Sequence, residues 1–269
     1  MEIYNIYEPT TKKVPIIVSS PHSGWAFPEN LKHRFKKKMI TRPDDTDWYI
    51  DRLYSFVKDL GITLISANFC RWVIDLNRDP DSKPLYDDGR VITALTPTTD
   101  FNGINLYETG EEPTDEEVTQ RIKEFYEPYH NKLHELTQAY KDEFGKVLLF
   151  DAHSIRDIVP GIRKEAFPQL ILGDNNGVSC SNTFINTALN ALKSSRYEVT
   201  HNYPFKGGYI TRSIGNPKEN IHALQLEMIK TNYMNDEQME YDKKRAENMQ
   251  KTLENMFVNL IEALEDEKG

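Results

Sequence analysis

Short apolar runs that alternate with amphipathic helical segments are the feature that most constrains how this chain can fold. Most of the runs are bounded by Gly, Pro, Ser, Asn or Asp, and they lie at residues 15–20, 62–68, 72–76, 146–153, 168–173, 208–213 and 221–229. The helical segments lie between or after them, at residues 45–61, 113–145, 179–195 and 236–266. Strands that alternate with helices predict a mostly parallel or mixed sheet covered by helices on both faces.

The longest central helical segment also carries signals for its two ends. Thr114 is a suitable N-cap, Glu117 follows it by three residues, and Gly145 closes the periodic pattern. The segment 77–112, by contrast, is rich in Pro, Gly and Asp and has little periodicity. We expect a long excursion there, of a kind that is often functional in compact domains.

Composition limits the class of partner. A formal net charge of -9 argues against nucleic acid, and the one basic cluster, 32-KHRFKKK-38, is more typical of a solvated helix face or loop. No apolar stretch approaches the length of a membrane span, so no membrane partner is expected. A length of 269 residues suits one α/β domain, and we expect residues 1–269 to form a single domain. The sequence leaves an oligomer possible but does not indicate one.

The cysteine content and the first residues indicate a compartment. Two cysteines, Cys70 and Cys180, lie far apart, as is typical of a reducing environment in which thiols are buried as small apolar groups. The first ten residues have neither a basic region nor an apolar core of a signal peptide. We therefore expect a cytoplasmic protein.

Polar side chains follow several of the predicted strands. His22 follows the first run, and Asp151, His153 and Ser154 end the run that begins at residue 146. Open α/β sheets bind ligands beyond the carboxyl ends of their strands, so these side chains are expected to converge. Two imidazoles and one carboxylate with an open position form the ligand set of a catalytic zinc site. Asp151 is a candidate to accept a hydrogen bond from a ligating imidazole.

The stretch 43-PDDTDWYID-51 offers the acid for such a site but does not decide which one. An Asp at a helix start can also cap the helix. We favour Asp47 as the ligand and keep Asp45 as the alternative ligand or as the cap. Asp51 is one helical turn from Asp47 on the same helix face, so we expect it to lie next to the metal ligands without binding the metal itself.

Glu227 interrupts the apolar run 221–229 and is the candidate general base. A carboxylate in apolar surroundings has a raised pKa, which suits proton transfer, although an edge-strand Glu that faces water is the alternative. Arg78 and Arg212 could bind substrate carboxylates in the bidentate geometry that guanidinium groups favour, or could pair with nearby acids. Gly207 and Gly208 would let the backbone approach a ligand closely.

The remaining histidines have no such surroundings. His130 and His134 are one helical turn apart and could hold a metal, but their helix is rich in charge, and a solvated face is the expected location. His33, His201 and His222 have no neighbouring group of candidate ligands.

Several stretches together resemble the N-formylglutamate amidohydrolase family. They are 19-SSPHSG-24, 43-PDDTDWYIDRLY-54, 73-VIDLNRDPDSKPLY-86, 126-YEPYH-130, 148-LLFDAHSIR-156, 205-FKGGYITR-212 and 224-LQLEM-228. They occur in the same order from about Val14 to Met234, and residues 235–269 fall outside the resemblance.

This family is similar to zinc carboxypeptidases and aspartoacylases, so the resemblance implies a three-layer α/β/α fold with a mixed sheet, of the phosphorylase/hydrolase-like type. It implies one zinc ion per chain, held by His22, His153 and an acid that is best matched by Asp47. It also implies Glu227 as the base, and Asn77 with Arg78 as the pair that holds a substrate carboxylate.

Arg212 is then a second candidate for a carboxylate, Arg78 a candidate cation beside the oxyanion, and Ser154 a further substrate contact. The implied activity is zinc-dependent hydrolysis of N-formyl-L-glutamate to formate and L-glutamate, a step of histidine degradation. Two alternatives remain open: another N-acyl amino acid or a peptide as substrate, and a non-catalytic ligand-binding member of the fold. The acyl group, the amino acid and the metal used in the cell are not decided by the sequence.

Overall fold

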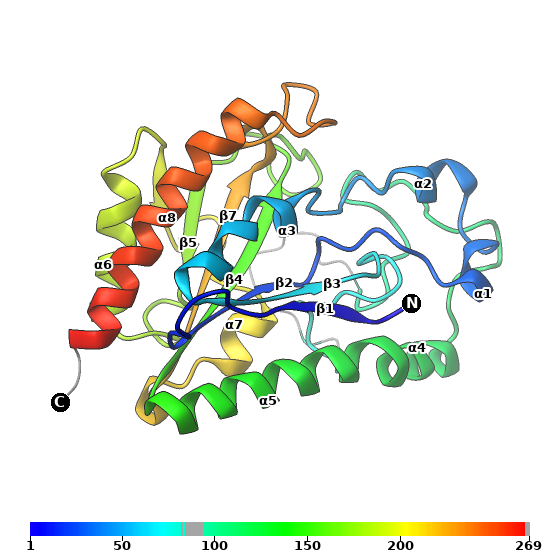
Figure 1. The fold of residues 1–269 in the computed structure, drawn as a ribbon. Coiled ribbons are helices and arrows are strands. Elements are labelled where there is room, and N and C mark those ends of the chain that lie inside the picture. Colours follow the sequence, from blue (N-terminus) through cyan, green and yellow to red (C-terminus); the bar gives the residue numbers. More distant parts are fainter. Residues whose placement is uncertain (82, 84–93, 267–269) are drawn as a thin grey trace.

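One mixed sheet forms the centre of the computed structural model, which describes residues 1–81, 83 and 94–266 (Figure 1). Its strands are β1 (Tyr4–Tyr7), β2 (Ile16–Ser20), β3 (Thr63–Ala67), β4 (Val147–Ile155), β5 (Leu170–Gly173), β6 (Val199–His201) and β7 (Ile221–Ile229). Their order is β1-β3-β2-β4-β7-β5-β6. The central strands β3, β2, β4 and β7 run parallel, while β1 pairs antiparallel with β3 and β5 pairs antiparallel with β7. The predicted mixed, mostly parallel sheet is confirmed.

Helices cover both faces of the sheet. One face packs against α3 (Ile50–Leu53), the 3₁₀ helix η1 (Ser55–Leu60), α6 (Asn182–Lys193) and α8 (Lys243–Asp266), and the other against α4 (Asp115–Arg121), the π-helical turn η2 (Ile122–Tyr126), α5 (Glu127–Phe144) and α7 (Tyr209–Ile214). Strand β4 shows the alternation behind this arrangement, since Leu148 and Phe150 face α8 while Val147 and Leu149 face α5. The predicted three-layer α/β/α architecture is confirmed. Short helices α1 (Glu29–Lys32), α2 (Lys37–Thr41), η3 (Pro217–Glu219) and η4 (Lys230–Asn232) complete the described elements.

The expected ends of the long helical segment are also found. The Thr114 side chain accepts a hydrogen bond from the backbone N–H of Glu117 and caps α4. Gly145 ends α5 with a φ of 79°, a left-handed conformation that glycine adopts without steric cost.

Two predicted strands are wrong. Residues 72–76 form turns and irregular structure, because side chains from a distant helix, rather than a neighbouring strand, hold their carbonyl groups. Residues 208–213 belong mostly to α7, whose Ile210 and Ile214 are one helical turn apart and are both buried under the sheet. The edge strands β1 and β6 have four and three residues, too short to stand out in the sequence.

The predicted helix at 45–61 is confirmed only from Ile50 onward, as α3 followed by the 3₁₀ helix η1, which ends before Gly61 as expected. Tyr49 has a φ of 65°, so a regular helix begins only at Ile50 and ends at Leu53. Helical spacing therefore does not connect Asp47 with Asp51, and Asp51 lines a surface pocket beside η1 and β1. The last helix begins at Lys243 rather than at residue 236, since a turn closed by pairing of Met234 with Tyr241 precedes it. Residues 82 and 84–93 of the expected excursion lie outside the described part of the chain.

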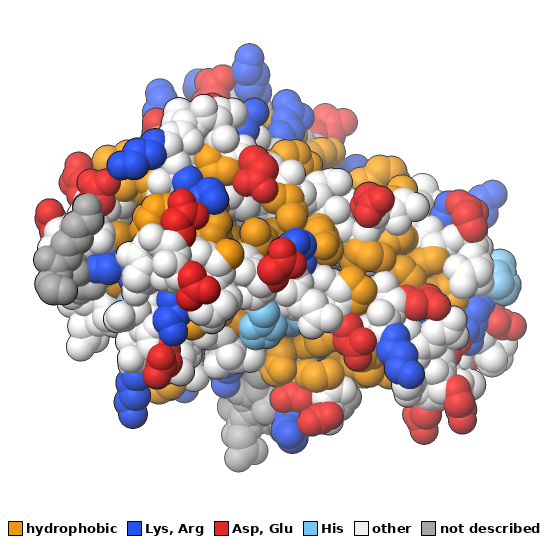
Figure 2. Space-filling view, turned by 60° about the horizontal axis from the view of Figure 1, so that its bottom comes forward, with side chains coloured by type: hydrophobic (Ala, Val, Ile, Leu, Met, Phe, Trp, Pro, Cys, Tyr) orange, Lys and Arg blue, Asp and Glu red, His pale blue; other side chains and the backbone are white. Residues whose placement is uncertain are grey.

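The face of the molecule shown in Figure 2 carries charged side chains of both signs. There, Lys and Arg side chains are interspersed with Asp and Glu around hydrophobic side chains. Within the described residues, no helix combines the length and the apolar composition needed to cross a bilayer.

Candidate metal centre

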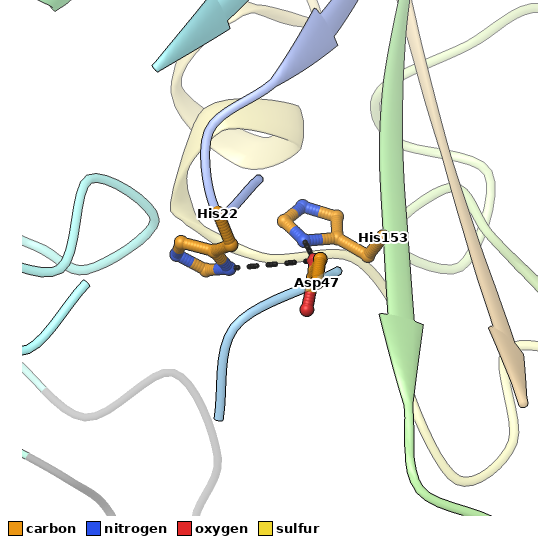
Figure 3. A group of neighbouring side chains, drawn as sticks. All are labelled: His22, Asp47 and His153. Carbon is orange, nitrogen blue, oxygen red and sulfur yellow. Dashed lines mark hydrogen bonds and ion pairs between the residues drawn. The ribbon is translucent and has the colours of Figure 1, made fainter. Parts of the chain in front are cut away.

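His22, Asp47 and His153 meet at the carboxyl ends of β2 and β4 (Figure 3). One ligand atom from each lies within 4.8 Å of the others. Asp47 Oδ2 is 3.1 Å from His153 Nδ1 and 3.9 Å from His22 Nδ1. All three side chains are buried, and the backbone N–H of Asp47 donates to the carbonyl of His22, which ties the acid to the end of β2.

A buried carboxylate holds the outer nitrogen of each histidine. His22 Nε2 is 2.7 Å from Asp75 Oδ1, and His153 Nε2 is 2.8 Å from Asp151 Oδ2. Neither aspartate is accessible to solvent. Carboxylates in this position fix the ring orientation and leave the other nitrogen, here Nδ1, directed at the shared centre.

The charges around the centre favour a cation within it. Burial alone would lower the pKa of His153, but Asp151 and Asp47 outweigh it and hold the pKa well above its usual value. Burial would raise the pKa of Asp75, yet Arg71 and His22 hold that pKa well below its usual value. Two zinc bonds of about 2.0–2.2 Å separate donor atoms by at most about 4.4 Å, which is close to the spacing found here. The donor set, its spacing and its charge therefore fit a small divalent ion.

The other acids of the 43–51 stretch have different partners. Asp45 Oδ2 accepts hydrogen bonds from Trp72 Nε1 at 2.8 Å and from the backbone N–H of Phe101 at 3.2 Å, and burial raises its pKa to about 6. Asp44 forms a bidentate ion pair with Arg156. Of the four aspartates, the structure brings Asp47 to the two histidines.

Glu227 lies beside the cluster on the neighbouring strand. Its register partner across the parallel pair of β4 and β7 is His153, so both side chains project from the same face. Strand β7 lies between β4 and β5, so the alternative of an edge-strand Glu is wrong. The side chain is partly buried, and burial, with help from Asp47 and Asp151, raises its pKa to about 8.

Arg71 is a site residue that the sequence reasoning missed. Its guanidinium donates to Asp75 Oδ2 at 2.5 Å and lies 3.2 Å from His22 Nδ1. The side chain is buried, with the charge stacked over the Phe101 ring at 4.8 Å. The signal in the sequence was an arginine inside the apolar run 69-FCRWVIDL-76, since a buried cation needs a buried acid.

Asn77 connects the centre to α7. Its Nδ2 donates to Asp151 Oδ2 at 3.1 Å, and its Oδ1 accepts from the backbone N–H of Ile210 at 2.8 Å. A Cβ on Gly208 would lie 2.3 Å from Asn77 Nδ2, so the glycine is required for this contact. Gly207, with a φ of 109°, makes the turn that precedes it.

The remaining predicted contacts lie around this core. Arg78 is partly buried, with Nε 3.7 Å from Asp75 Oδ2. Arg212 belongs to α7, and its Nε donates to the carbonyl of Gly207 at 2.8 Å. The Ser154 hydroxyl is 2.7 Å from the hydroxyl of Tyr233, on the face of β4 opposite to His153.

The expected solvated position of His130 is wrong. Its side chain is buried, stacks on Tyr126 with ring centres 4.0 Å apart, and donates from Nε2 to the carbonyl of Leu76 at 2.8 Å. Burial lowers its pKa to about 4, so the ring is neutral near pH 7. Apart from the buried Arg121, the charged residues that suggested a solvated face are exposed or partly exposed.

Comparisons with known proteins agree on one family. The family model described as N-formylglutamate amidohydrolase matches residues 14–234. An N-formylglutamate deformylase of Pseudomonas putida is 35% identical over 251 residues, which cover 93% of each chain. One of Pseudomonas aeruginosa is 38% identical over 227 residues, or 84% of each chain. The crystal structure of N-formylglutamate amidohydrolase from Ralstonia eutropha JMP134 superposes with a TM-score of 0.80 at 25% identity, covering 96% of this chain and 98% of that one.

Proposed function

Because this chain belongs to the N-formylglutamate amidohydrolase family, we propose that it hydrolyses the formamide bond of N-formyl-L-glutamate to formate and L-glutamate. The observation that carries the proposal is the buried cluster of His22, Asp47 and His153, with Glu227 beside it. The two relatives named deformylase support the same substrate.

We propose that one zinc ion per chain is held by His22 Nδ1, His153 Nδ1 and Asp47 Oδ2. Zinc supplies Lewis acidity to a carbonyl oxygen and to water when bound in such a site. The support for this ion is the donor chemistry of the cluster together with the two carboxylates that hold the outer nitrogens.

Glu227 acts as the base in the proposed mechanism. Its carboxylate takes a proton from the water that attacks the formyl carbon, and the same proton then passes to the nitrogen of glutamate as the C–N bond breaks. In the protein without metal, burial raises the pKa of Glu227 to about 8, which brings it toward the working pH, where a group that must both accept and return a proton works best.

The substrate is a dianion, so local cations must outweigh a net charge of -9. We assign its carboxylates to Arg78 and Arg212, with the backbone at Gly207 and Gly208 as further contacts. Ser154, which was expected to join them, has its hydroxyl bonded to Tyr233 on the opposite face of β4 and is not assigned to the substrate. We assign the charge that develops on the carbonyl oxygen to Arg71 together with Arg78, since both cations lie against Asp75 beside the cluster. The role proposed for Asn77 is to orient Asp151 as well as to meet the substrate.

The test is a formate-release assay on N-formyl-L-glutamate, with N-formyl-L-aspartate and N-acetyl-L-glutamate as competitors, before and after treatment with a chelator. We expect formate release from N-formyl-L-glutamate, its loss on chelation and its return with zinc, and about one zinc per chain in the purified protein. Activity that survives complete chelation would refute the metal site, and preferred turnover of the acetyl compound would refute the substrate.

With this activity the chain would act in histidine degradation, where its substrate would be N-formyl-L-glutamate. We propose a cytoplasmic location, which the buried thiols of Cys70 and Cys180 support.

A further inference from the structure

Residues 71–78 carry Arg71, Asp75, Asn77 and Arg78, yet this segment belongs to no helix or strand. Most of it is buried. Buried backbone carbonyls need hydrogen-bond donors, and an irregular segment cannot obtain them from a regular ladder. The source of these donors therefore decides what holds the segment in place.

Three of the donors are side chains of the continuous helical stretch 115–144. Arg121 Nη1 donates to the carbonyl of Val73 at 2.9 Å, Tyr126 Oη to that of Arg78 at 2.7 Å, and His130 Nε2 to that of Leu76 at 2.8 Å. A carbonyl only accepts, so Nε2 of His130 carries the proton. All three donor side chains are buried.

The π-helical turn η2 brings these donors to one side of the helix. Arg121 and Tyr126 are five residues apart, a spacing that in an α-helix would rotate the second side chain about 140° from the first. The i to i+5 pattern of a π turn returns them to similar directions, and such turns occur frequently at functional sites. Tyr126 and His130 then stack and reach the carbonyls on either side of Asn77.

We infer that Tyr126 and His130, with Arg121, are positioning residues that hold segment 71–78 so that its acids and amide meet the two histidines. Asp75 holds His22 from this segment, and Asn77 holds Asp151 behind His153. The inference rests on the proposed function for its effect on turnover, but its effect on the segment itself does not depend on that function.

Tyr126→Phe tests the inference, because it removes only the hydroxyl that binds the carbonyl of Arg78. Tyr140→Phe is a matched control: Tyr140 lies on the same helix and is equally buried. Its hydroxyl shares a hydrogen bond with Thr63 Oγ1 at the start of β3, at the far end of the sheet from the cluster. Each variant loses one buried hydroxyl, so we expect both melting temperatures to fall; the Tyr126 hydroxyl also contacts that of Tyr209, so its variant can fall somewhat further.

The measurement is amide hydrogen exchange of peptides that cover residues 71–78, made on the metal-free proteins. The backbone amides of Asp75 and Arg78 are hydrogen-bonded in the native structure, so their exchange reports opening of the segment. We expect faster exchange in Tyr126→Phe and unchanged exchange in Tyr140→Phe. We also expect Tyr126→Phe alone to lower kcat/KM for N-formyl-L-glutamate and to weaken zinc binding, each by about tenfold or more.

Unchanged exchange in Tyr126→Phe overturns the inference whatever the wild-type activity. Faster exchange with kcat/KM and zinc affinity equal to those of Tyr140→Phe also overturns it, since the segment would then move without consequence for the site. If the wild type releases no formate but exchange and zinc affinity change as expected, the positioning role stands and the proposed substrate falls.

Discussion

Replacing Glu227 by Gln should remove most of the turnover while leaving the metal centre intact. Glutamine keeps the size and polarity of the side chain but cannot accept the proton of the attacking water. General acid–base catalysis contributes about 10²–10⁴-fold to a rate, which corresponds to about 2.7–5.4 kcal/mol of the barrier. We expect kcat to fall by that factor with a small change in KM, since Glu227 is not among the groups assigned to bind substrate.

The fold of this variant should be preserved. Burial raises the pKa of Glu227 from 4.5 to about 8, so the folded state prefers the protonated acid, which glutamine resembles. With the folded pKa raised, the stabilisation is fully present below the unfolded pKa and is lost as the pH rises through about 8. The metal-free Glu227→Gln protein should therefore gain stability relative to the metal-free wild type between pH 5 and 9, in denaturant titrations.

The assay is formate release together with zinc content, and Glu219→Gln is the control, since it makes the same chemical change at an exposed residue just before β7. We expect both variants to contain about one zinc per chain and only the control to turn over at the wild-type rate. Turnover by Glu227→Gln within threefold of the wild type would refute the assignment of the base, because even the lower limit of general-base catalysis is about a hundredfold.

Three further outcomes follow from the site. Asp151→Asn should weaken zinc binding about 10–100-fold in a chelator competition, because His153 loses the carboxylate that orients it, and an unchanged affinity would contradict that role. Asp47→Ala should be purified without zinc, whereas Asp45→Ala should keep zinc. The free energy of unfolding of Asp45→Ala should fall by about 1–3 kcal/mol for each hydrogen-bond donor left unpaired. The reverse pattern of zinc contents would exchange the roles of the two aspartates. The lowered pKa of His130 contributes stability that is present above pH 6.5 and is lost as the pH falls through about 4. In denaturant titrations, the free energy of unfolding of the wild type should therefore fall over this window by roughly 3 kcal/mol more than that of His130→Phe. Parallel curves for the two proteins would show that the ring does not titrate as expected.

The strand ends of the candidate site could be predicted from the sequence. His22, His153 and Glu227 each follow or end an apolar run that forms a central strand, and parallel strands bring their carboxyl ends to one edge. The partner of His153 could be predicted as well, since Asp151 is two residues earlier in the same strand and therefore on the same face.

The segment after the third strand could not be predicted in the same way. Residues 72–76 have the apolar character of a strand because they are buried, but burial does not reveal which groups satisfy their backbone. Those groups lie on a helix about fifty residues further along, and their alignment depends on a π turn that has no signature in hydrophobic periodicity. The role of Arg71 was missed for the same reason, since its partner Asp75 was assigned to a strand.

The two histidines are therefore held by different kinds of structure. Asp151, which holds His153, is part of β4 and is fixed by the sheet itself, whereas Asp75, which holds His22, lies on an irregular segment that depends on Arg121, Tyr126 and His130. Core strands open at free energies that approach the free energy of global unfolding, but an irregular segment held by a few side chains can open locally at a lower cost in free energy. Loosening segment 71–78 should consequently release His22 while His153 remains in place. We therefore expect the affinity for the proposed metal to be limited by the packing of a helix that contributes no ligand.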